Sequence, residues 1–248
     1  MNQINDLLIL VVVYNKEPGT SAAIESIESI RSNNDLSFKV LIHDNSKNSS
    51  KSFEALDFLY KNNPSNVGVS GAYNSACEVA EKRGCSWMLL LDQDTSFDNS
   101  LLNEFLHHRD GADVCVPQVY YQNKKMSPSS KSFINSGLFV STATFKSVGG
   151  YNERLRLDYT DVDFSNRLHQ SSARFVELDA RLDHQLDFYS YSLEEAMHRF
   201  LIFLEDASAF KDISGKKFRV FKDVFLRAIK LTMVHRTLWF LKKVLLGG

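Results

Sequence analysis

Residues 7–13 form an unbroken run of seven apolar side chains. A strand with one face in water alternates apolar and polar residues, so this run indicates a strand that is covered on both faces, as in a parallel sheet. Two further short apolar segments, 39–43 and 86–91, have the same character. Between these segments lie stretches whose apolar residues recur at helical spacing, at 20–31, 52–60 and 70–82. The alternation predicts an α/β fold in which helices flank a doubly wound, mostly parallel sheet.

The second half of the chain is more varied. It contains strand-like segments at 114–120, 133–140 and 174–177, a polar loop at 123–131 and a helical pattern at 161–170. A strongly helical stretch then follows at 192–210, with Ser192 as its predicted N-cap, and helical spacing resumes from residue 218. We therefore expect one domain over 1–190, with a first part at about 1–95 and a second part at about 96–190. Residues 191–248 are expected to form a helical C-terminal extension.

Charge is unevenly distributed along the chain. The net charge of the whole sequence is −1, which provides no global field for nucleic acid, but residues 211–248 contain ten Lys or Arg and only two Asp or Glu. A basic tail on an acidic body suggests an anionic partner such as a membrane surface. Trp239, Phe240 and Leu241 beside Lys242 and Lys243 resemble an interfacial helix. The alternative is a helix that packs on the catalytic domain or on a partner subunit, as in a homo-oligomer.

The cysteines and the N-terminus point to a cytoplasmic protein. Three cysteines without metal-ligand spacing argue against a disulfide framework and against a zinc site. The first apolar run extends over residues 7–14, which is too short to span a membrane, and no basic segment precedes it. We expect a cytoplasmic chain that can associate peripherally with the inner face of the membrane.

Polar clusters follow three of the predicted strands. Tyr14, Asn15 and Glu17 come after the first, Asp44 comes after the second, and the triplet Asp92-Gln93-Asp94 comes after the strand at 86–91. Ligands of an open parallel sheet bind beyond the carboxyl ends of its strands, so these clusters should line one crevice. The structural alternative for Asp44 is an Asx-turn.

The Asp92-Gln93-Asp94 triplet suggests a metal site. Carboxylate oxygens are hard ligands that suit Mg²⁺ or Mn²⁺ shared with a phosphate. Such an ion would neutralise the charge of a departing diphosphate. The competing interpretation is an acidic turn in which an Asp caps the next helix.

The order of the motifs VVVYN, IHDNS, NPSNVGVSGAYN and LLLDQD resembles the glycosyltransferase family 2 enzymes, which have a GT-A fold. The later stretch SGLFVSTATFKSVGGYNERLRLDYTDVDFSNRL is similar to the bacterial rhamnosyltransferase branch. The resemblance covers residues 7–190. It implies a metal-dependent, inverting transferase that takes L-rhamnose from dTDP-L-rhamnose, or a hexose from a UDP-sugar. The implied acceptor is a lipid-linked saccharide in the synthesis of a surface polysaccharide such as O-antigen or capsule.

The resemblance also implies roles for single residues. Tyr14, Asn15 and Asp44 would line the base pocket, Asp92 would face the ribose and Asp94 would bind the metal. Asp161 aligns with the base that deprotonates the acceptor, and His184 falls where relatives place a His near the metal and diphosphate. The remaining expected nucleotide contacts are Glu17, Gln93 and the small-residue turn that contains Asn66, Gly71 and Asn74.

Each of these roles has a structural alternative. Asp161 could be an acidic helix N-terminus, His184 could be a core histidine, and the glycines could serve tight packing. A non-catalytic nucleotide-sugar-binding protein is the competing function, and a nucleotidyltransferase is disfavoured because only one Lys follows the first strand. The transferase hypothesis requires Asp94 and Asp161 to lie in the same cleft.

Overall fold

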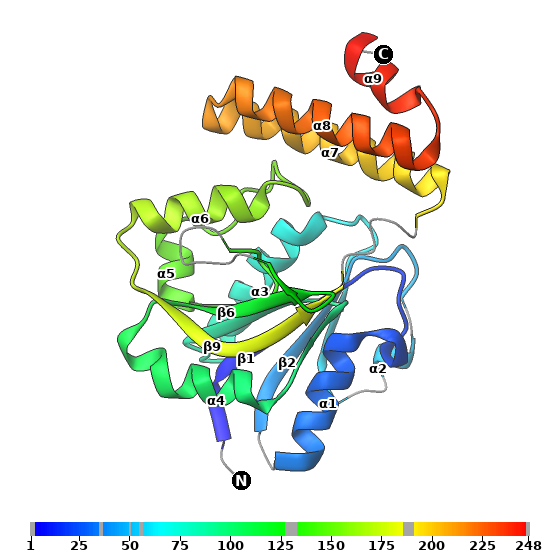
Figure 1. Cartoon of the computed structure of the whole chain (residues 1–248). Coiled ribbons are helices and arrows are strands. Elements are labelled where there is room, and N and C mark those ends of the chain that lie inside the picture. The colour runs from blue at the N-terminus through cyan, green and yellow to red at the C-terminus, as the bar shows by residue number, and fades with distance from the viewer. Residues whose placement is uncertain are drawn as a thin grey trace.

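The computed structural model describes residues 3–34, 37–49, 51–54, 57–126, 133–185 and 191–246. Within them the strands form one mixed sheet in the order β3-β2-β1-β4-β8-β6-β9-β5, with β7 paired to β6 (Figure 1). The strands are β1 (Gln3–Val13), β2 (Ser37–Asp44), β3 (Leu59–Asn62), β4 (Trp87–Asp92), β5 (Thr95–Phe97), β6 (Val114–Tyr121), β7 (Lys124–Lys125), β8 (Leu138–Ser141) and β9 (Phe175–His184).

The first four strands are parallel and the second half of the sheet is mixed. In the parallel half, Val13 of β1 lies opposite Asp44 of β2, and Val12 lies opposite Asp92 of β4, so the carboxyl ends of these strands are level. Strand β8 then runs antiparallel to both β4 and β6, and β9 returns parallel to β6. The predicted α/β architecture of the GT-A type is confirmed.

Helices cover both faces of the sheet, as Figure 1 shows. Alternate residues of β1 enter different cores: Leu7, Ile9 and Val11 pack with α1 and α4, whereas Leu8 and Leu10 pack with α3, α5 and α6. This division explains why the first strand has no polar side. The flanking helices are α1 (Ala22–Asn34), α2 (Lys51–Glu54), α3 (Gly68–Lys82), α4 (Asn99–His108), α5 (Thr142–Ser147) and α6 (Thr160–Gln170), with short 3-10 turns at Pro18–Thr20 and Arg109–Gly111.

The expected helix at 52–60 is wrong. Among the residues of this segment that the structure describes, Lys51–Glu54 is helical, and Leu59–Asn62 is the edge strand β3, which pairs in parallel with β2. Tyr60 of this strand stacks on Phe53, with ring centroids 5.8 Å apart. A segment this short has too few residues to distinguish a helical pattern from a strand pattern, and pairing with β2 decides its conformation.

Strand β9 is longer than the expected strand at 174–177. Its buried residues Leu178, Ala180 and Leu182 alternate with charged residues, which is the pattern of a half-exposed strand. The extension carries the strand to His184, opposite Thr95 of β5. The alternation of apolar and charged residues over 177–183 is therefore the sequence pattern that indicates this extension.

Three C-terminal helices lie beyond the sheet: α7 (Leu193–Ser214), α8 (Lys217–His235) and α9 (Trp239–Leu246). Figure 1 shows α7 and α8 side by side, with α9 at their end. The predicted N-cap is confirmed, because Ser192 and Glu195 form a reciprocal capping box. In the part of the chain that the structure describes, no helix is both long and apolar enough to cross a bilayer.

Candidate functional site

Two carboxylates and an imidazole converge where β4 ends. Ligand atoms of Asp92, Asp94 and His184 all lie within 4.8 Å of one another. His184 Nδ1 is 3.4 Å from Asp94 Oδ1, and the backbone N–H of Gln185 donates to the Asp94 carbonyl at 3.1 Å. Asp92, predicted to face the ribose, thus shares a group with the two predicted metal ligands. Two hard oxygens and one imidazole nitrogen form a donor set that fits Mn²⁺ or Mg²⁺.

Two hydroxyl groups contact members of this group: Thr95 contacts the imidazole of His184, and Ser136 contacts the backbone of Asp92. Thr95 Oγ1 is 3.0 Å from His184 Nδ1 and 2.6 Å from Ser136 Oγ. Ser136 in turn accepts the backbone N–H of Asp92 at 2.9 Å. The buried chain Asp92–Ser136–Thr95–His184 therefore ties β4, the turn before β8, β5 and β9 together. Such contacts orient metal ligands and are part of a metal site.

The predicted nucleotide residues at the ends of β1 and β4 contact one another. The N–H of Tyr14 donates to Gln93 Oε1 at 2.8 Å. Asn15 adopts a left-handed conformation, with φ of 50°, and its N–H donates to Ser46 Oγ at 2.8 Å. Glu17 follows with an exposed side chain at the N-cap of the short helix Pro18–Thr20. The edge of the sheet thus forms one connected polar surface.

Asp44 is buried at the carboxyl end of β2. One of its carboxylate oxygens accepts the N–H of Ser46 at 2.8 Å, and the other accepts the hydroxyl of Tyr60 at 2.7 Å. The first contact is the Asx-turn that was the structural alternative for this residue. A carboxylate has about four acceptor sites, and these contacts use two of them.

Residues in the first turn of α3 pack closely against other parts of the protein. The N–H of Val69 donates to the Arg156 carbonyl at 2.7 Å, and a Cβ at Gly68, where φ is +73°, would lie 2.2 Å from the same oxygen. Gly71 faces the side chain of Val67. A phosphate was expected to approach the backbone at this turn. The Arg156 carbonyl instead fills the space beside Gly68 and accepts the N–H of Val69, so the geometry favours the tight-packing alternative.

Asn66 and Asn74 also hold the loop at 151–156. The Asn66 side chain accepts the N–H of Gly68 at 3.2 Å, and its carbonyl accepts from Arg156 at 2.9 Å. Asn74 exchanges two hydrogen bonds with the backbone of Tyr151, at 2.8 and 3.0 Å, and donates to Glu153. Their polar groups are therefore directed to the protein.

Asp161 lies in the first turn of α6. Burial raises the pKa of its carboxyl above the ordinary value, and the negative charges of Asp158 and Asp92 act in the same direction. The N–H of Val162 donates to Asp161 Oδ1 at 2.8 Å and favours the ionised form. Asp161 directly follows Thr160, whose hydroxyl accepts a hydrogen bond from Asn135 at 2.7 Å.

Two buried tyrosines connect these acidic groups. The Tyr73 hydroxyl donates to Asp92 Oδ1 at 3.1 Å, and its ring is 4.8 Å from that of Tyr151. Tyr151 donates to Asn135 Oδ1 at 2.8 Å, and Asn135 donates to the hydroxyl of Thr160, the residue before Asp161, at 2.7 Å. Burial and the nearby carboxylates raise the pKa of both tyrosines well above the ordinary value, so both phenols remain donors.

The loop before α6 is fastened by α7 and α8. Buried Asp206 of α7 accepts the backbone N–H groups of Arg156, Leu157 and Asp158 at 2.7 to 2.9 Å. Asp158 pairs with Arg199 of α7 and with Arg227 of α8, and these two cations lower its pKa although burial acts to raise it.

One left-handed backbone position is held by these helices. Tyr159 has a φ of 60°, the left-handed region, and its ring stacks on Phe210 with centroids 4.6 Å apart. Left-handed conformations are unfavourable for bulky residues and persist only where surrounding contacts impose them. The C-terminal helices therefore position the loop that carries Asp161.

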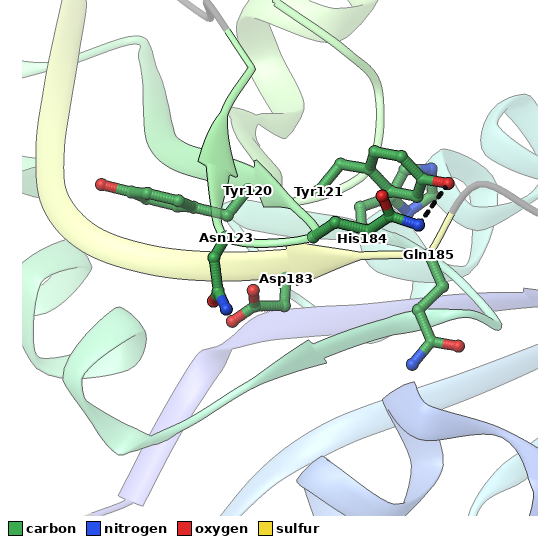
Figure 2. Close-up of a pocket in the computed structure, with 7 residues that line it drawn as sticks. Tyr120, Tyr121, Asn123, Asp183, His184 and Gln185 are labelled. Atoms are coloured by element: carbon green, nitrogen blue, oxygen red, sulfur yellow. Dashed lines mark hydrogen bonds between the residues drawn. The ribbon is translucent and has the colours of Figure 1, made fainter.

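Two pockets adjoin the site. One, of about 450 Å³, lies between the β6–β7 hairpin and the end of β9; His184 lines it together with Asp183 and Gln185, as Figure 2 shows. The other, of about 380 Å³, lies between the start of α6 and the C-terminal helices. Its lining includes Asp158, Asp161, Phe203, Asp223, Leu226 and Arg227.

Several of these residues are difficult to find in the sequence. Ser136 and Asn135 stand in Asn-Ser-Gly before a strand, where a turn is the ordinary interpretation. Asp206 and Arg199 lie within a helical pattern in which charged residues usually face water. Their partners are 41 to 50 positions away, and no local pattern indicates the contact.

A family comparison agrees with this geometry. A model described as "Glycosyl transferase family 2" matches residues 8–166, more than half of the chain. The chain belongs to glycosyl transferase family 2. The matched residues include Asp92, Asp94 and Asp161, whereas His184 lies beyond them. A search of curated proteins finds no match.

Solved glycosyltransferase structures resemble the fold of this family 2 chain. The crystal structure of S. aureus TarS 1-349 aligns with a TM-score of 0.57 and 18% identity, over 84% of this chain and 72% of that one, and it was also solved with UDP. GalNAc-T7 with UDP, GalNAc and Mn²⁺ aligns with a TM-score of 0.57 and 13% identity, over 73% of this chain and 44% of that one. At these identities the likeness concerns the fold.

Proposed function

We propose that the chain transfers a sugar from a nucleotide diphosphate donor to a saccharide hydroxyl, with inversion at the anomeric carbon and with a divalent cation. The observation that carries this proposal is the pairing of two sites: the group Asp92, Asp94 and His184, and the half-buried carboxyl of Asp161. The contacts of Tyr73, Tyr151 and Asn135 connect Asp92 to Thr160, the residue before Asp161. A transferase needs a place for the leaving group and a base for the acceptor, and this arrangement offers both.

Asp92, Asp94 and His184 would hold the cation. Bound there, Mg²⁺ or Mn²⁺ would supply charge neutralisation for the departing diphosphate. Thr95 contacts the imidazole of His184, and Ser136 holds the backbone of Asp92 through the same hydroxyl chain. The presence of Mn²⁺ in the GalNAc-T7 structure is consistent with this role.

Asp161 would accept the proton of the acceptor hydroxyl. A base has to be ionised before the reaction and basic enough to take the proton, so a carboxyl whose pKa is raised by burial is better suited than an exposed one. Asp158 remains ionised beside Arg199 and Arg227 and is engaged by them. We therefore assign the base to Asp161. Direct displacement by the hydroxyl inverts the configuration.

The nucleotide would lie along the carboxyl ends of β1, β2 and β4. Tyr14, Asn15, Glu17, Asp44 and Gln93 are the proposed contacts, with Asp44 accepting the imide N–H of the base. Uracil and thymine carry the same imide, so this contact does not distinguish them. The TarS and GalNAc-T7 structures with UDP support a uridine donor, and the motif resemblance supports dTDP-L-rhamnose.

We take dTDP-L-rhamnose as the donor and a UDP-hexose as the alternative. The acceptor would be a lipid-linked saccharide of a surface polysaccharide such as O-antigen or capsule, used at the cytoplasmic face of the inner membrane. The pocket of about 380 Å³ beside Asp161 is the proposed acceptor site. Two copies could act together, and no nucleic acid is involved.

A donor panel tests the proposal. The purified chain is incubated with dTDP-L-rhamnose, UDP-glucose, UDP-galactose and UDP-N-acetylglucosamine, each with Mn²⁺, with Mg²⁺ or with a chelator, and release of nucleotide diphosphate is measured. Metal-dependent release from one donor would support the transferase and name its substrate. Binding of a donor by calorimetry without release, with saccharide acceptors present, would support the non-catalytic alternative. Release of nucleotide diphosphate at an unchanged rate in the presence of a chelator would refute the proposed role of the metal.

A further inference from the structure

An apolar face of α8 is exposed instead of buried. Phe218 is 82% exposed, Phe221 is 57% exposed and Met233 is 67% exposed. Spacings of three and four residues place Phe225 and Ile229 on the same side of the helix. The rings of Phe221 and Phe225 stack, with centroids 6.1 Å apart. The opposite side of α8 packs on α7 through other residues, among which Val220 and Ala228 are buried.

Basic residues share this face. Lys222 is exposed one turn after Phe218, and Arg236, the left-handed C-cap residue directly after α8, is also exposed. We define the α8 outer face as Phe218, Phe221, Lys222, Phe225, Ile229, Met233 and Arg236. The one acidic residue of α8, Asp223, lines the pocket beside Asp161 instead. The outer face is therefore both apolar and uniformly positive.

The residues expected to touch a membrane are different and are packed inside. Phe240 is fully buried and lies edge-on to Phe200 of α7 at 5.3 Å between centroids. Trp239 packs in the same small cluster as Leu241. Within the part of the chain that the structure describes, α9 thus holds the tail to α7, and Phe218, Phe221 and Met233 of the α8 outer face stay exposed.

We propose that the α8 outer face binds the surface of an anionic lipid bilayer. Phenylalanine rings enter the boundary between headgroups and acyl chains, and lysine and arginine beside them interact with anionic headgroups. Charge complementarity selects this partner, because ten Lys or Arg and only two Asp or Glu lie in residues 211–248. The same face of a second copy would oppose positive charge with positive charge.

The orientation has a consequence for the pocket beside Asp161. Asp223, Leu226 and Arg227 line this pocket from α8, on a side of the helix adjacent to the outer face. A chain bound through the outer face would keep the pocket close to the bilayer surface. Lipid binding is measured without donor, so its test is independent of the proposed transferase activity.

Vesicle flotation of the full chain tests the proposal. We expect binding to vesicles of phosphatidylglycerol and phosphatidylcholine in equal parts, weakening as salt rises, and little binding to pure phosphatidylcholine. The double variant Lys222→Glu with Arg236→Glu should bind the anionic vesicles more than about tenfold more weakly, because each basic residue near such a surface contributes a several-fold factor. Lys124→Glu with Lys125→Glu makes the same charge change on the exposed β7 hairpin and should bind as the unmodified chain does.

A second pair of substitutions tests the apolar contribution. Phe218→Ser with Phe221→Ser removes two exposed rings, so the circular dichroism spectrum should be unchanged while vesicle binding falls about tenfold. The proposal would be overturned if either double variant bound anionic vesicles as tightly as the unmodified chain does. It would also be overturned if the unmodified chain did not bind anionic vesicles but formed a dimer in light scattering, and the serine substitutions abolished that dimer.

Discussion

Asp206 provides the most direct test of how the C-terminal helices support the site. Its side chain is 1% exposed, and its two carboxylate oxygens accept three backbone N–H groups of the loop before α6. Asp206→Asn keeps one oxygen, which can still accept from Arg156. The new amide group would face the N–H groups of Leu157 and Asp158, so donors would oppose donors.

The expected loss follows from those two contacts. Hydrogen bonds to a charged group contribute roughly 1.5–3 kcal/mol each, and buried donors without an acceptor add a cost, so we expect about 3–5 kcal/mol lower unfolding free energy. That is a large fraction of the roughly 5–15 kcal/mol of a typical domain. A shift of the loop by about 1 Å would also misplace Asp161 and lower kcat on the order of a hundredfold.

Urea unfolding followed by tryptophan fluorescence gives the stability, and calorimetry gives the affinity for the donor. Donor affinity should be nearly unchanged, because the proposed nucleotide contacts lie at the ends of β1, β2 and β4. Asp212→Asn is the matched control on the same helix: Asp212 is exposed and pairs with Arg154 at 3.6 Å, so its loss should cost less than about 1 kcal/mol. A stable Asp206→Asn variant with unimpaired kcat would refute the positioning role.

Three further outcomes follow from the acidic groups. Asp161→Asn should lower kcat by about 10²–10⁴-fold while calorimetry shows unchanged donor binding; weaker binding with unchanged kcat would reassign the residue. Because burial raises the pKa of Asp161, the acidic limb of the kcat–pH profile should lie above the ordinary Asp value of about 3.9, and a limb below that value would contradict the assignment. Arg199 and Arg227 lower the pKa of Asp158, so its ionised form stabilises the fold above about pH 3.9, and this contribution is lost as the pH falls further. Asp158→Asn should cost about 3 kcal/mol at pH 7, and its unfolding free energy should depend less on pH in acid than that of the unmodified chain.

Local pattern was sufficient for the parallel half of the sheet. The apolar run in β1 reflects burial on both faces, and the polar groups after β1, β2 and β4 lie at one edge because parallel strands align their carboxyl ends. The pair Asp92 and Asp94 was visible for the same reason. Where two patterns competed in a short segment, as at 52–60, local information was not enough, and pairing of β3 with β2 decided the outcome.

The acidic groups around this edge were named from the sequence, but their connections were not. Thr95 reaches His184 because β5 pairs with β9, and the two residues are 89 positions apart. Tyr73 and Tyr151 meet because α3 and the turn before Asp161 pack on one face of the sheet. Such contacts depend on the relative placement of whole elements, which no window of sequence encodes.

The family, the layered α/β fold and the candidate carboxylates could be inferred from the sequence alone. Burial of a strand or helix face repeats apolar residues at a short spacing, and turns after strands use short polar motifs. The tertiary structure alone decided that Asp206, Arg199 and Arg227 support the loop of Asp161, and that the aromatic stripe of α8 is exposed while Phe240 is buried. The helical spacing of Phe218, Phe221 and Phe225 indicates only that they share a face. Whether that face meets protein or solvent depends on how α7, α8 and α9 pack together.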